Sequence, residues 1–174
     1  AQIGIAIPKN SRQASRQPLL LLQVSRQMLV FTDNIDEIPA VSGAYVLVLE
    51  ISKKLGLTIP RFRGVTVMPG LYAYAGSARG PGGIQARCRR HLRKSKKLHW
   101  HVDHLTSRAR RIQVAAVVDG NECDLRASLQ AQTPCEFPVP GFGSSDCPHC
   151  LSHLLLLKDP VALSHITCNS HDIV

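Results

Sequence analysis

The sequence predicts one α/β domain of the α+β type, with a small, mainly antiparallel, three-stranded sheet flanked by helices. The chain has 174 residues and 44% hydrophobic composition, enough for one packed core. Strand-like and helix-like segments follow one another between residues 43 and 130. Every apolar run is shorter than the roughly eighteen residues that a transmembrane helix needs, so we expect no membrane association.

The strands are predicted from β-branched and aromatic runs. Gly43–Ile51 is such a run and is expected to be a buried strand. After a turn, residues 57–59 are expected to form a short second strand. Residues 71–76 alternate large side chains with alanine and form the third. Because segments 43–51 and 71–76 lie close in sequence, we expect them to pair as antiparallel neighbours.

A glycine-rich break at residues 80–83 precedes a predicted helix at 84–94. Its apolar residues form one stripe, which consists of Ile84, Cys88 and Leu92. Arg87 and His91 flank this stripe at the edge of the core. The other arginines of the helix are expected to face solvent: Arg89, Arg90 and Arg93.

Further along, we expect a helix at 100–106 and a strand at 112–118. Asn121 is the predicted N-cap of a helix that ends near residue 130. On this helix Glu122 shares the side of Leu125 and Leu129, which face the core. A Pro- and Gly-rich stretch then leads to a last short helix at 151–157.

The expected organisation is a flexible N-terminal extension at 1–31, the domain at 32–158 and a C-terminal tail at 159–174. An Arg- and Ser-rich start without acids also fits an organelle transit peptide, but no amphipathic helix is clear there. Six cysteines are too few for a disulfide scaffold of this length. We therefore expect a cytoplasmic, reducing location.

The net charge of +9 is concentrated in one part of the chain. Residues 79–111 hold eleven basic residues and one acid, Asp103, so the remainder sums to about −1. Clustered Lys and Arg release counterions from nucleic acid, which we favour over a solvated helix face. A membrane surface is less suitable, because large apolar residues are few. The candidate nucleic-acid contacts are Arg79, Arg89, Arg90, Arg93, Lys94, Lys96, Lys97, His99, Trp100 and His101.

Glu122 needs a partner or a metal, because a carboxylate on an apolar helix face is costly to bury. Opposite a phosphate, one carboxylate commonly holds a divalent cation. Arg87 could then clamp a phosphate oxygen, while a tyrosine or His91 positions or deprotonates water. On spacing alone, an ion pair between Glu122 and Arg87 at the helix N-terminus remains an equal alternative.

Two short motifs carry a resemblance. Gly43-Ala44-Tyr45 opens the first strand and Tyr74-Ala75-Gly76 ends a later one. Together with ARCRRH and Glu122, they resemble the GIY-YIG nuclease superfamily over about residues 41–129, with alanine at two positions where isoleucine is usual. GLYAYAGSARGPGG, HWHVDHL and GFGSSDC followed by SHL resemble an uncharacterised branch of GIY-YIG-like domains. This branch occurs alone or fused to endonuclease III-type glycosylases.

The resemblance implies a metal-dependent endonuclease that cuts DNA, rather than RNA, in DNA repair, with a repair glycosylase as a partner. Tyr45 and Tyr74 would line the cleft, and one of them would activate water. Arg87 would bind the scissile phosphate, His91 would assist with a proton, and Glu122 would hold one Mg²⁺ or Mn²⁺. Tyr72 shares the face of Tyr74 and is a possible substitute, although a core aromatic is the simpler interpretation. The alternative function is a non-catalytic nucleic-acid-binding module that recruits a repair enzyme.

Cys147 and Cys150 form a CxxC pair with His149 and His153 nearby. A structural zinc site would need two more ligands, and Cys123 or Cys135 could supply them only if the fold brings them near. We therefore expect free buried thiols rather than zinc.

Overall fold

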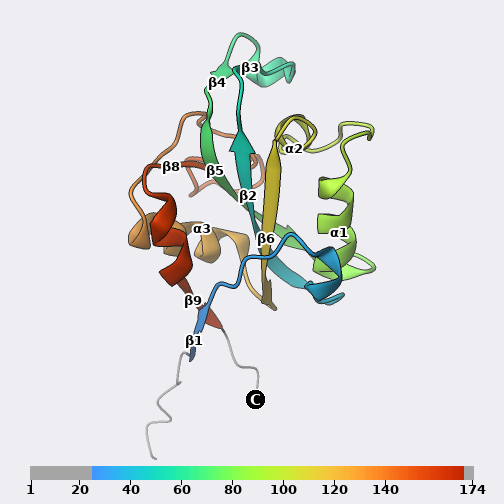
Figure 1. Cartoon of the computed structure of the whole chain (residues 1–174), viewed down its shortest axis with the longest axis vertical. Helices are drawn as coiled ribbons and strands as arrows, with labels where there is room; N and C mark the ends of the chain where they lie inside the picture. The colour runs from blue at the N-terminus through green and yellow to red at the C-terminus, as the bar shows by residue number, and fades with distance from the viewer. Residues whose placement is uncertain (1–24, 171–174) are drawn as a thin grey trace, which may run out of the picture.

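A fully antiparallel five-stranded sheet, in the order β6-β2-β5-β8-β7, forms the centre of the protein (Figure 1). The structure is a computed structural model and describes residues 25–170. The strands are β2 (Gly43–Ile51), β5 (Gly70–Ala78), β6 (Arg111–Val118), β7 (Cys135–Glu136) and β8 (Leu154–Leu157). The predicted α/β class is confirmed, but the sheet has more strands than expected.

The strand β2 lies between β5 and β6 and pairs with both of them along almost its whole length. This confirms the expected pairing of the first and third predicted strands. The side chains of β2 are buried on both faces of the sheet. Such a strand needs apolar residues at successive positions, which explains the unbroken apolar run from Ala44 to Leu49.

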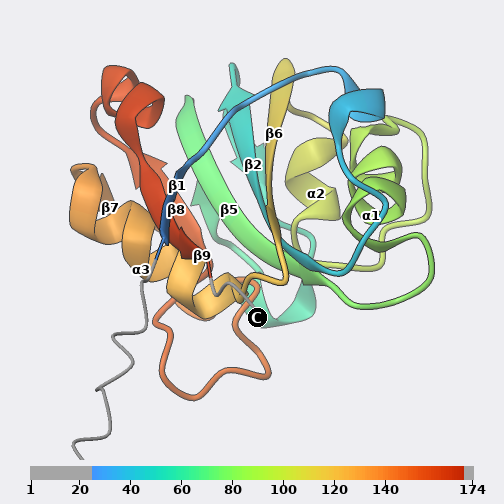
Figure 2. The same ribbon diagram turned by 90° about the horizontal axis from the view of Figure 1, so that it is seen from below.

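Helices cover both faces of this sheet, so the molecule has three layers (Figure 2). The helices α1 (Gly83–Leu92) and α2 (Asp103–Thr106) lie on one face, and α3 (Glu122–Gln132) lies on the other. Tyr45 and Leu47 of β2 and Ile84 of α1 belong to the first core. Val46 of β2 and Leu125 of α3 belong to the second. The predicted apolar stripe of α1 is confirmed, and Asn121 is the N-cap of α3 as predicted.

Two predicted elements are wrong. Residues 57–59 form no strand: a short hairpin of β3 (Leu55–Gly56) and β4 (Thr66–Val67) and the 3₁₀ turn η2 (Pro60–Phe62) surround them. Residues 154–157, predicted as part of a helix, form β8 and pair with β5 and β7. A short run of leucines fits a buried helix or a buried strand equally well, and here the open edge of β5 selects the strand.

The two ends of the described chain meet in a second sheet, where β1 (Ser25–Met28) pairs with β9 (Thr167–Ser170). There are also two 3₁₀ segments: η1 (Ile35–Glu37), which contacts α1, and η3 (Pro160–His165), which precedes β9. Parts of the predicted extension and tail thus join the fold, and residues 1–24 and 171–174 lie outside the described residues. Within residues 25–170, no helix is both long and apolar enough to cross a bilayer.

Candidate active site

The structure brings all five predicted catalytic residues to one cavity of about 320 Å³. They come from four elements that surround one end of the sheet. Tyr45 lies on β2, Tyr74 on β5, Arg87 and His91 on α1, and Glu122 at the first position of α3. Segments separated by up to 77 positions in the sequence therefore share one site.

Two glycines make room for the tyrosines of the cavity. Tyr45 is opposite Gly76 in the sheet register, and a Cβ at Gly76 would lie 2.6 Å from the Tyr45 hydroxyl. A Cβ at Gly143 would lie 2.5 Å from the ring of Tyr74. Burial raises the pKa of Tyr45 well above its usual value and the pKa of Tyr74 to about 12. Both hydroxyl groups are therefore protonated at neutral pH.

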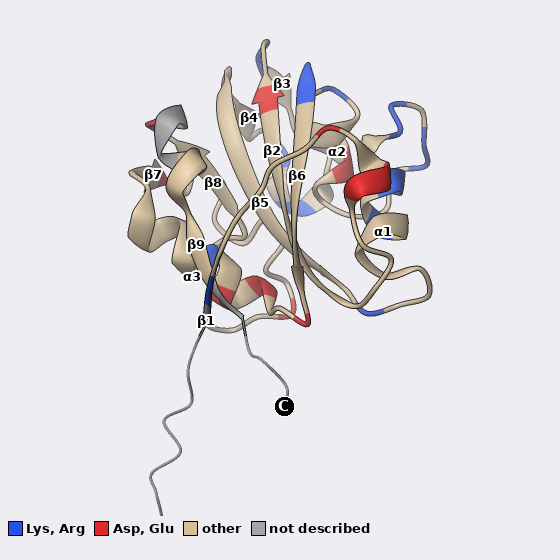
Figure 3. Ribbon diagram, turned by 60° about the horizontal axis from the view of Figure 1, so that its bottom comes forward, with Lys and Arg blue, Asp and Glu red and all other residues tan. Residues whose placement is uncertain are grey.

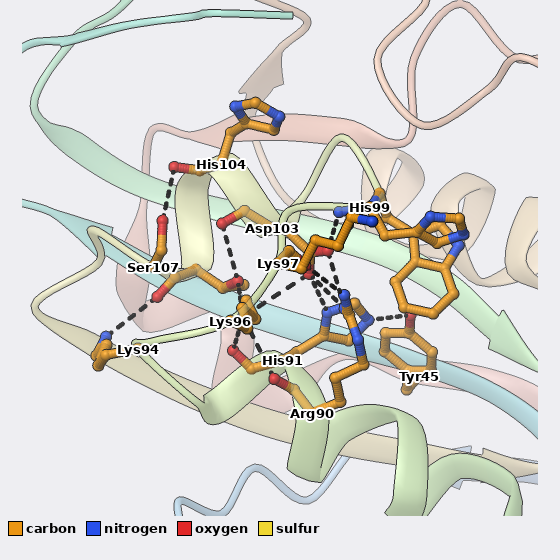
Figure 4. A network of polar contacts seen from close by, with 12 residues as sticks. Tyr45, Arg90, His91, Lys94, Lys96, Lys97, His99, Asp103, His104 and Ser107 are labelled. Carbon is orange, nitrogen blue, oxygen red and sulfur yellow. Dashed lines mark hydrogen bonds and ion pairs between the residues drawn. The ribbon is translucent and has the colours of Figure 1, made fainter.

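A chain of hydrogen bonds leads away from the cavity through Tyr45, His91 and Asp103 (Figure 4). The Tyr45 Oη is 2.9 Å from His91 Nε2, and His91 Nδ1 is 3.2 Å from Asp103 Oδ1. Burial, together with the nearby charges of Lys96 and Arg87, lowers the pKa of His91 although Asp103 opposes this shift. A neutral His91 that donates from Nδ1 to the carboxylate must accept at Nε2, so the Tyr45 hydroxyl is the donor.

Asp103, which the sequence did not single out for the site, is fully buried at the centre of this network. Its carboxylate also accepts both backbone N–H groups of His99 and Trp100 and a double contact from Arg90 Nη1, all at 2.9–3.0 Å. Burial would raise the pKa of Asp103, but these hydrogen bonds and the one from His91 outweigh it and hold the pKa far below its usual range. Its signal in the sequence is that it is the one acid within the basic stretch.

The predicted division of the α1 arginines into one at the core edge and three facing solvent is wrong for Arg90. Its side chain points inward instead. It binds Asp103 and donates to the Lys97 carbonyl at 2.8 Å. Lys96 is also held inside: its side chain is only 4% exposed, and Nζ lies 3.7 Å from Asp103. Burial lowers the pKa of Lys96 to about 8. These two residues stabilise the site and are not free to bind nucleic acid.

Arg87 is the unpaired arginine of the site. Its guanidinium lies 4.4 Å from the ring centre of Trp100, on which Arg90 also stacks at 4.3 Å. Among residues 25–170, the Arg87 guanidinium makes no hydrogen bond or ion pair. All its donors are available to a ligand in the cavity.

The other candidate nucleic-acid contacts belong mostly to α1 and the loop after it, where blue segments gather in Figure 3. Arg89 pairs with the exposed Asp36 at 2.9 Å. His101 points inward, where its Nδ1 accepts the Gly143 N–H at 3.1 Å. Lys94 donates from Nζ to the carbonyls of Thr106 and Ala109. The other exposed candidates are Arg79, Arg89, Arg93, Lys97 and His99.

Glu122 begins α3 directly after its N-cap, Asn121, whose Oδ1 accepts the Cys123 N–H at 2.7 Å. The Glu122 carboxylate has no hydrogen bond or ion pair within the described part of the chain. The alternative that it pairs with Arg87 is therefore wrong. A partnerless carboxylate and a partnerless guanidinium in one cavity suit a cation and a phosphate. Tyr72, by contrast, is a core aromatic that donates to the Met68 carbonyl at 2.7 Å.

A group of three cysteines and one histidine that could hold a metal ion adjoins the cavity. The side-chain ligand atoms of Cys123, Cys147, Cys150 and His153 lie within 4.8 Å of one another. The predicted CxxC pair thus gains Cys123, not Cys135, and the histidine three positions after Cys150. Thiolate and imidazole donors suit zinc better than magnesium.

Residues 44–173 match a family model described as Domain of unknown function DUF123. The match covers well over half of the chain and includes every residue of the cavity. Searches of curated proteins and of solved structures find no match. The chain belongs to the DUF123 family.

Proposed function

We propose that the protein is a metal-dependent endonuclease of the GIY-YIG type that hydrolyses phosphodiester bonds of DNA, in repair. One observation carries the proposal: Arg87 and Glu122 line one cavity and make no hydrogen bond or ion pair with residues 25–170, beside a tyrosine hydroxyl that donates to a neutral histidine. A few convergent polar groups in a concave pocket are typical of a ligand site, and here the two groups carry opposite charges. The resemblance to GIY-YIG nucleases names the same residues.

Glu122 would hold one Mg²⁺ or Mn²⁺. Mg²⁺ is usually bound through one or two carboxylates, with water and substrate phosphate oxygens completing its octahedron. Glu122 is a partly exposed carboxylate that lines the cavity, which fits this requirement. When bound, the ion would withdraw charge from the phosphate and stabilise the leaving oxygen.

Arg87 would bind the scissile phosphate. Its planar guanidinium can donate two parallel hydrogen bonds to non-bridging oxygens, and stacking on Trp100 fixes the plane. The charge of the guanidinium would compensate the negative charge that grows on these oxygens as water attacks. The exposed Arg93 and Lys97 would hold the flanking backbone.

Tyr45 and His91 would move the proton of the attacking water. The Tyr45 oxygen takes a proton from the water while the Tyr45 proton passes to His91 Nε2. The water oxygen bonds to phosphorus, and the bond from phosphorus to the leaving sugar oxygen breaks. That oxygen takes a proton from solvent, and the His91 imidazolium, stabilised by Asp103, later releases its proton to solvent. One water is consumed, and a phosphomonoester and a hydroxyl are formed.

Single-turnover cleavage with Mn²⁺ on branched, nicked and single-stranded DNA tests the proposal. Glu122→Gln should lose cleavage and keep its fold and DNA binding. Asp124→Asn is the matched control, because Asp124 lies in the same helical turn but outside the cavity. Full cleavage by Glu122→Gln would refute the role of Glu122. Tight binding without cleavage of any substrate would instead support a binding module that recruits a repair enzyme.

A further inference from the structure

We infer that Cys123, Cys147, Cys150 and His153 bind one structural zinc ion, and that this ion fixes one wall of the active-site cavity. Zinc binding by these residues does not depend on the proposed nuclease function. Only the expected effect of zinc on cleavage rests on that function. The distances, the donor types and the connections between the four residues support the inference.

The distances fit a tetrahedral ion. Zinc with Zn–S bonds of about 2.3 Å holds two thiolate sulfurs about 3.8 Å apart. The Cys123 Sγ lies 3.5 Å from the Cys147 Sγ and 3.8 Å from His153 Nε2. All four ligand atoms are within 4.8 Å of one another. The three cysteines are free thiols, so no disulfide competes for the sulfurs.

The donor set indicates a structural ion. Three thiolates and one imidazole fill all four positions of a tetrahedron, which leaves none for a water or a substrate. Soft sulfur donors also exclude Mg²⁺ as the natural occupant. The zinc ion would therefore be distinct from the cation proposed at Glu122.

Hydrogen bonds help to position three of the four ligands, Cys147, Cys150 and His153. The His153 N–H donates to the Phe142 carbonyl at 2.9 Å, and its carbonyl accepts the Ala75 N–H at 3.1 Å. The Cys150 N–H donates to the Cys147 Sγ at 3.3 Å. A backbone N–H that points at a sulfur favours the thiolate, which is the form that binds metal.

The ion would join three segments that surround the cavity. Cys123 directly follows Glu122 at the start of α3, and His153 directly precedes β8, where Leu154 pairs with Tyr74. Residues 137–153 contain no helix or strand, and connections longer than about 12–15 residues are uncommon without such support. This loop nevertheless contributes Gly143 and Asp146 to the cavity. Zinc would fix the position of this loop relative to Glu122.

Elemental analysis of the full chain, purified without a metal-affinity tag, tests the site. We expect one zinc ion per chain in the wild type and in Cys135→Ser, the control at a partly buried cysteine outside the group. Cys150→Ser should lose the ion. After cobalt substitution, only the wild type and Cys135→Ser should show thiolate charge-transfer bands and the absorption bands of tetrahedral cobalt. A zinc-free wild type after refolding with zinc, or full zinc in Cys150→Ser, would overturn the inference.

A second variant and the melting temperature test the site even if Cys150→Ser does not fold or the protein does not cleave DNA. If Cys150→Ser does not fold, Cys150→His supplies a fourth donor and should restore both zinc and the fold; a folded Cys150→His without zinc contradicts the site. Chelation should lower the melting temperature of the wild type, and an unchanged value contradicts a structural ion. Cleavage should fall about 10- to 100-fold on zinc loss. Zinc content and melting temperature do not depend on DNA, so failure of the proposed nuclease would leave these results intact.

Discussion

Tyr45 on β2 and His91 on α1 are joined by a 2.9 Å hydrogen bond between Tyr45 Oη and His91 Nε2. The hydroxyl is the donor, because Asp103 occupies the other ring nitrogen of His91. Burial keeps the proton on Tyr45, since its pKa is raised well above the usual value. The hydroxyl can act on water only if His91 takes this proton at the same time, so the pair is expected to work as a unit.

Removal of the Tyr45 hydroxyl should abolish cleavage without unfolding the protein. In Tyr45→Phe the ring still packs over Gly76, and the proton path is lost, so the single-turnover rate should fall about 10²–10⁴-fold. Tyr72→Phe is the matched control: it removes a buried hydroxyl that binds Met68 and should cost about 1 kcal/mol of stability with little effect on the rate. Equal rate losses in the two variants would contradict the assignment.

The sequence predicted the elements whose patterns are long and regular. The strand β2, the stripe of α1 and the Asn121 cap of α3 each depend on local chemistry that the fold does not override. The family resemblance added the five cavity residues, which no local pattern connects. Their convergence is a tertiary property, because Tyr45 and Glu122 meet only through the sheet and the turn before α3.

Other features could not be predicted because they depend on partners distant in sequence. Arg90 turns inward only because Asp103 lies beneath it, and a helix face calculated from spacing contains no such information. The segment 154–157 becomes a strand because β5 has a free edge. Likewise, Cys123 joins the CxxC pair only once α3 packs next to the loop at 147–150.

The buried Asp103 should contribute far more stability than an exposed aspartate with a similar ion pair. Asp103→Asn leaves Arg90 and Lys96 without their counterion in a buried network and should cost about 3 kcal/mol. Asp36→Asn breaks a surface pair with Arg89 and should cost less than about 1 kcal/mol. Chemical denaturation of both variants measures the difference. Equal losses would contradict the central role of Asp103.

The same network makes stability depend on pH in a defined direction. The pKa of His91 in the folded protein is lowered from 6.5, so below pH 6.5 the unfolded chain binds a proton that the folded chain excludes. Stability should therefore decrease as the pH falls below 6.5. The pKa of Asp103 is lowered from 3.8, so its contribution is complete above that value and is lost under more acidic conditions. Denaturation series should show a smaller slope below pH 6.5 in His91→Gln, and an unchanged slope would contradict a neutral His91.

Arg87 and the exposed basic residues should separate turnover from binding. Arg87→Ala should reduce the cleavage rate about 10²–10³-fold, as loss of a donor to transition-state charge does, with DNA affinity largely kept. Arg93→Ala combined with Lys97→Ala should weaken binding to all sequences and reduce the salt slope by roughly one unit per lost phosphate contact. Rate and salt titrations on both proteins test this. If Arg87→Ala and the double variant lost cleavage rate and DNA affinity in the same pattern, the separation of a turnover arginine from binding residues would be refuted.

Gly143 should be necessary for the position of Tyr74. Its backbone has φ +73°, and a Cβ would lie 2.5 Å from the Tyr74 ring. Gly64 has a similar φ of +84° but nothing within 4 Å of a Cβ. Gly64→Ala therefore reports backbone strain alone, about 1 kcal/mol, whereas Gly143→Ala adds an overpacking cost of about 1–3 kcal/mol.

Thermal unfolding and cleavage together test this difference. Since Tyr74 lines the cavity, displacement of its ring in Gly143→Ala should also slow cleavage, while Gly64→Ala should cleave at the wild-type rate. Equal stability losses in the two variants would mean that the loop moves away at no cost. In that case Gly143 would not position Tyr74, and the loop at 137–153 would be less tightly held than a zinc-bound wall requires.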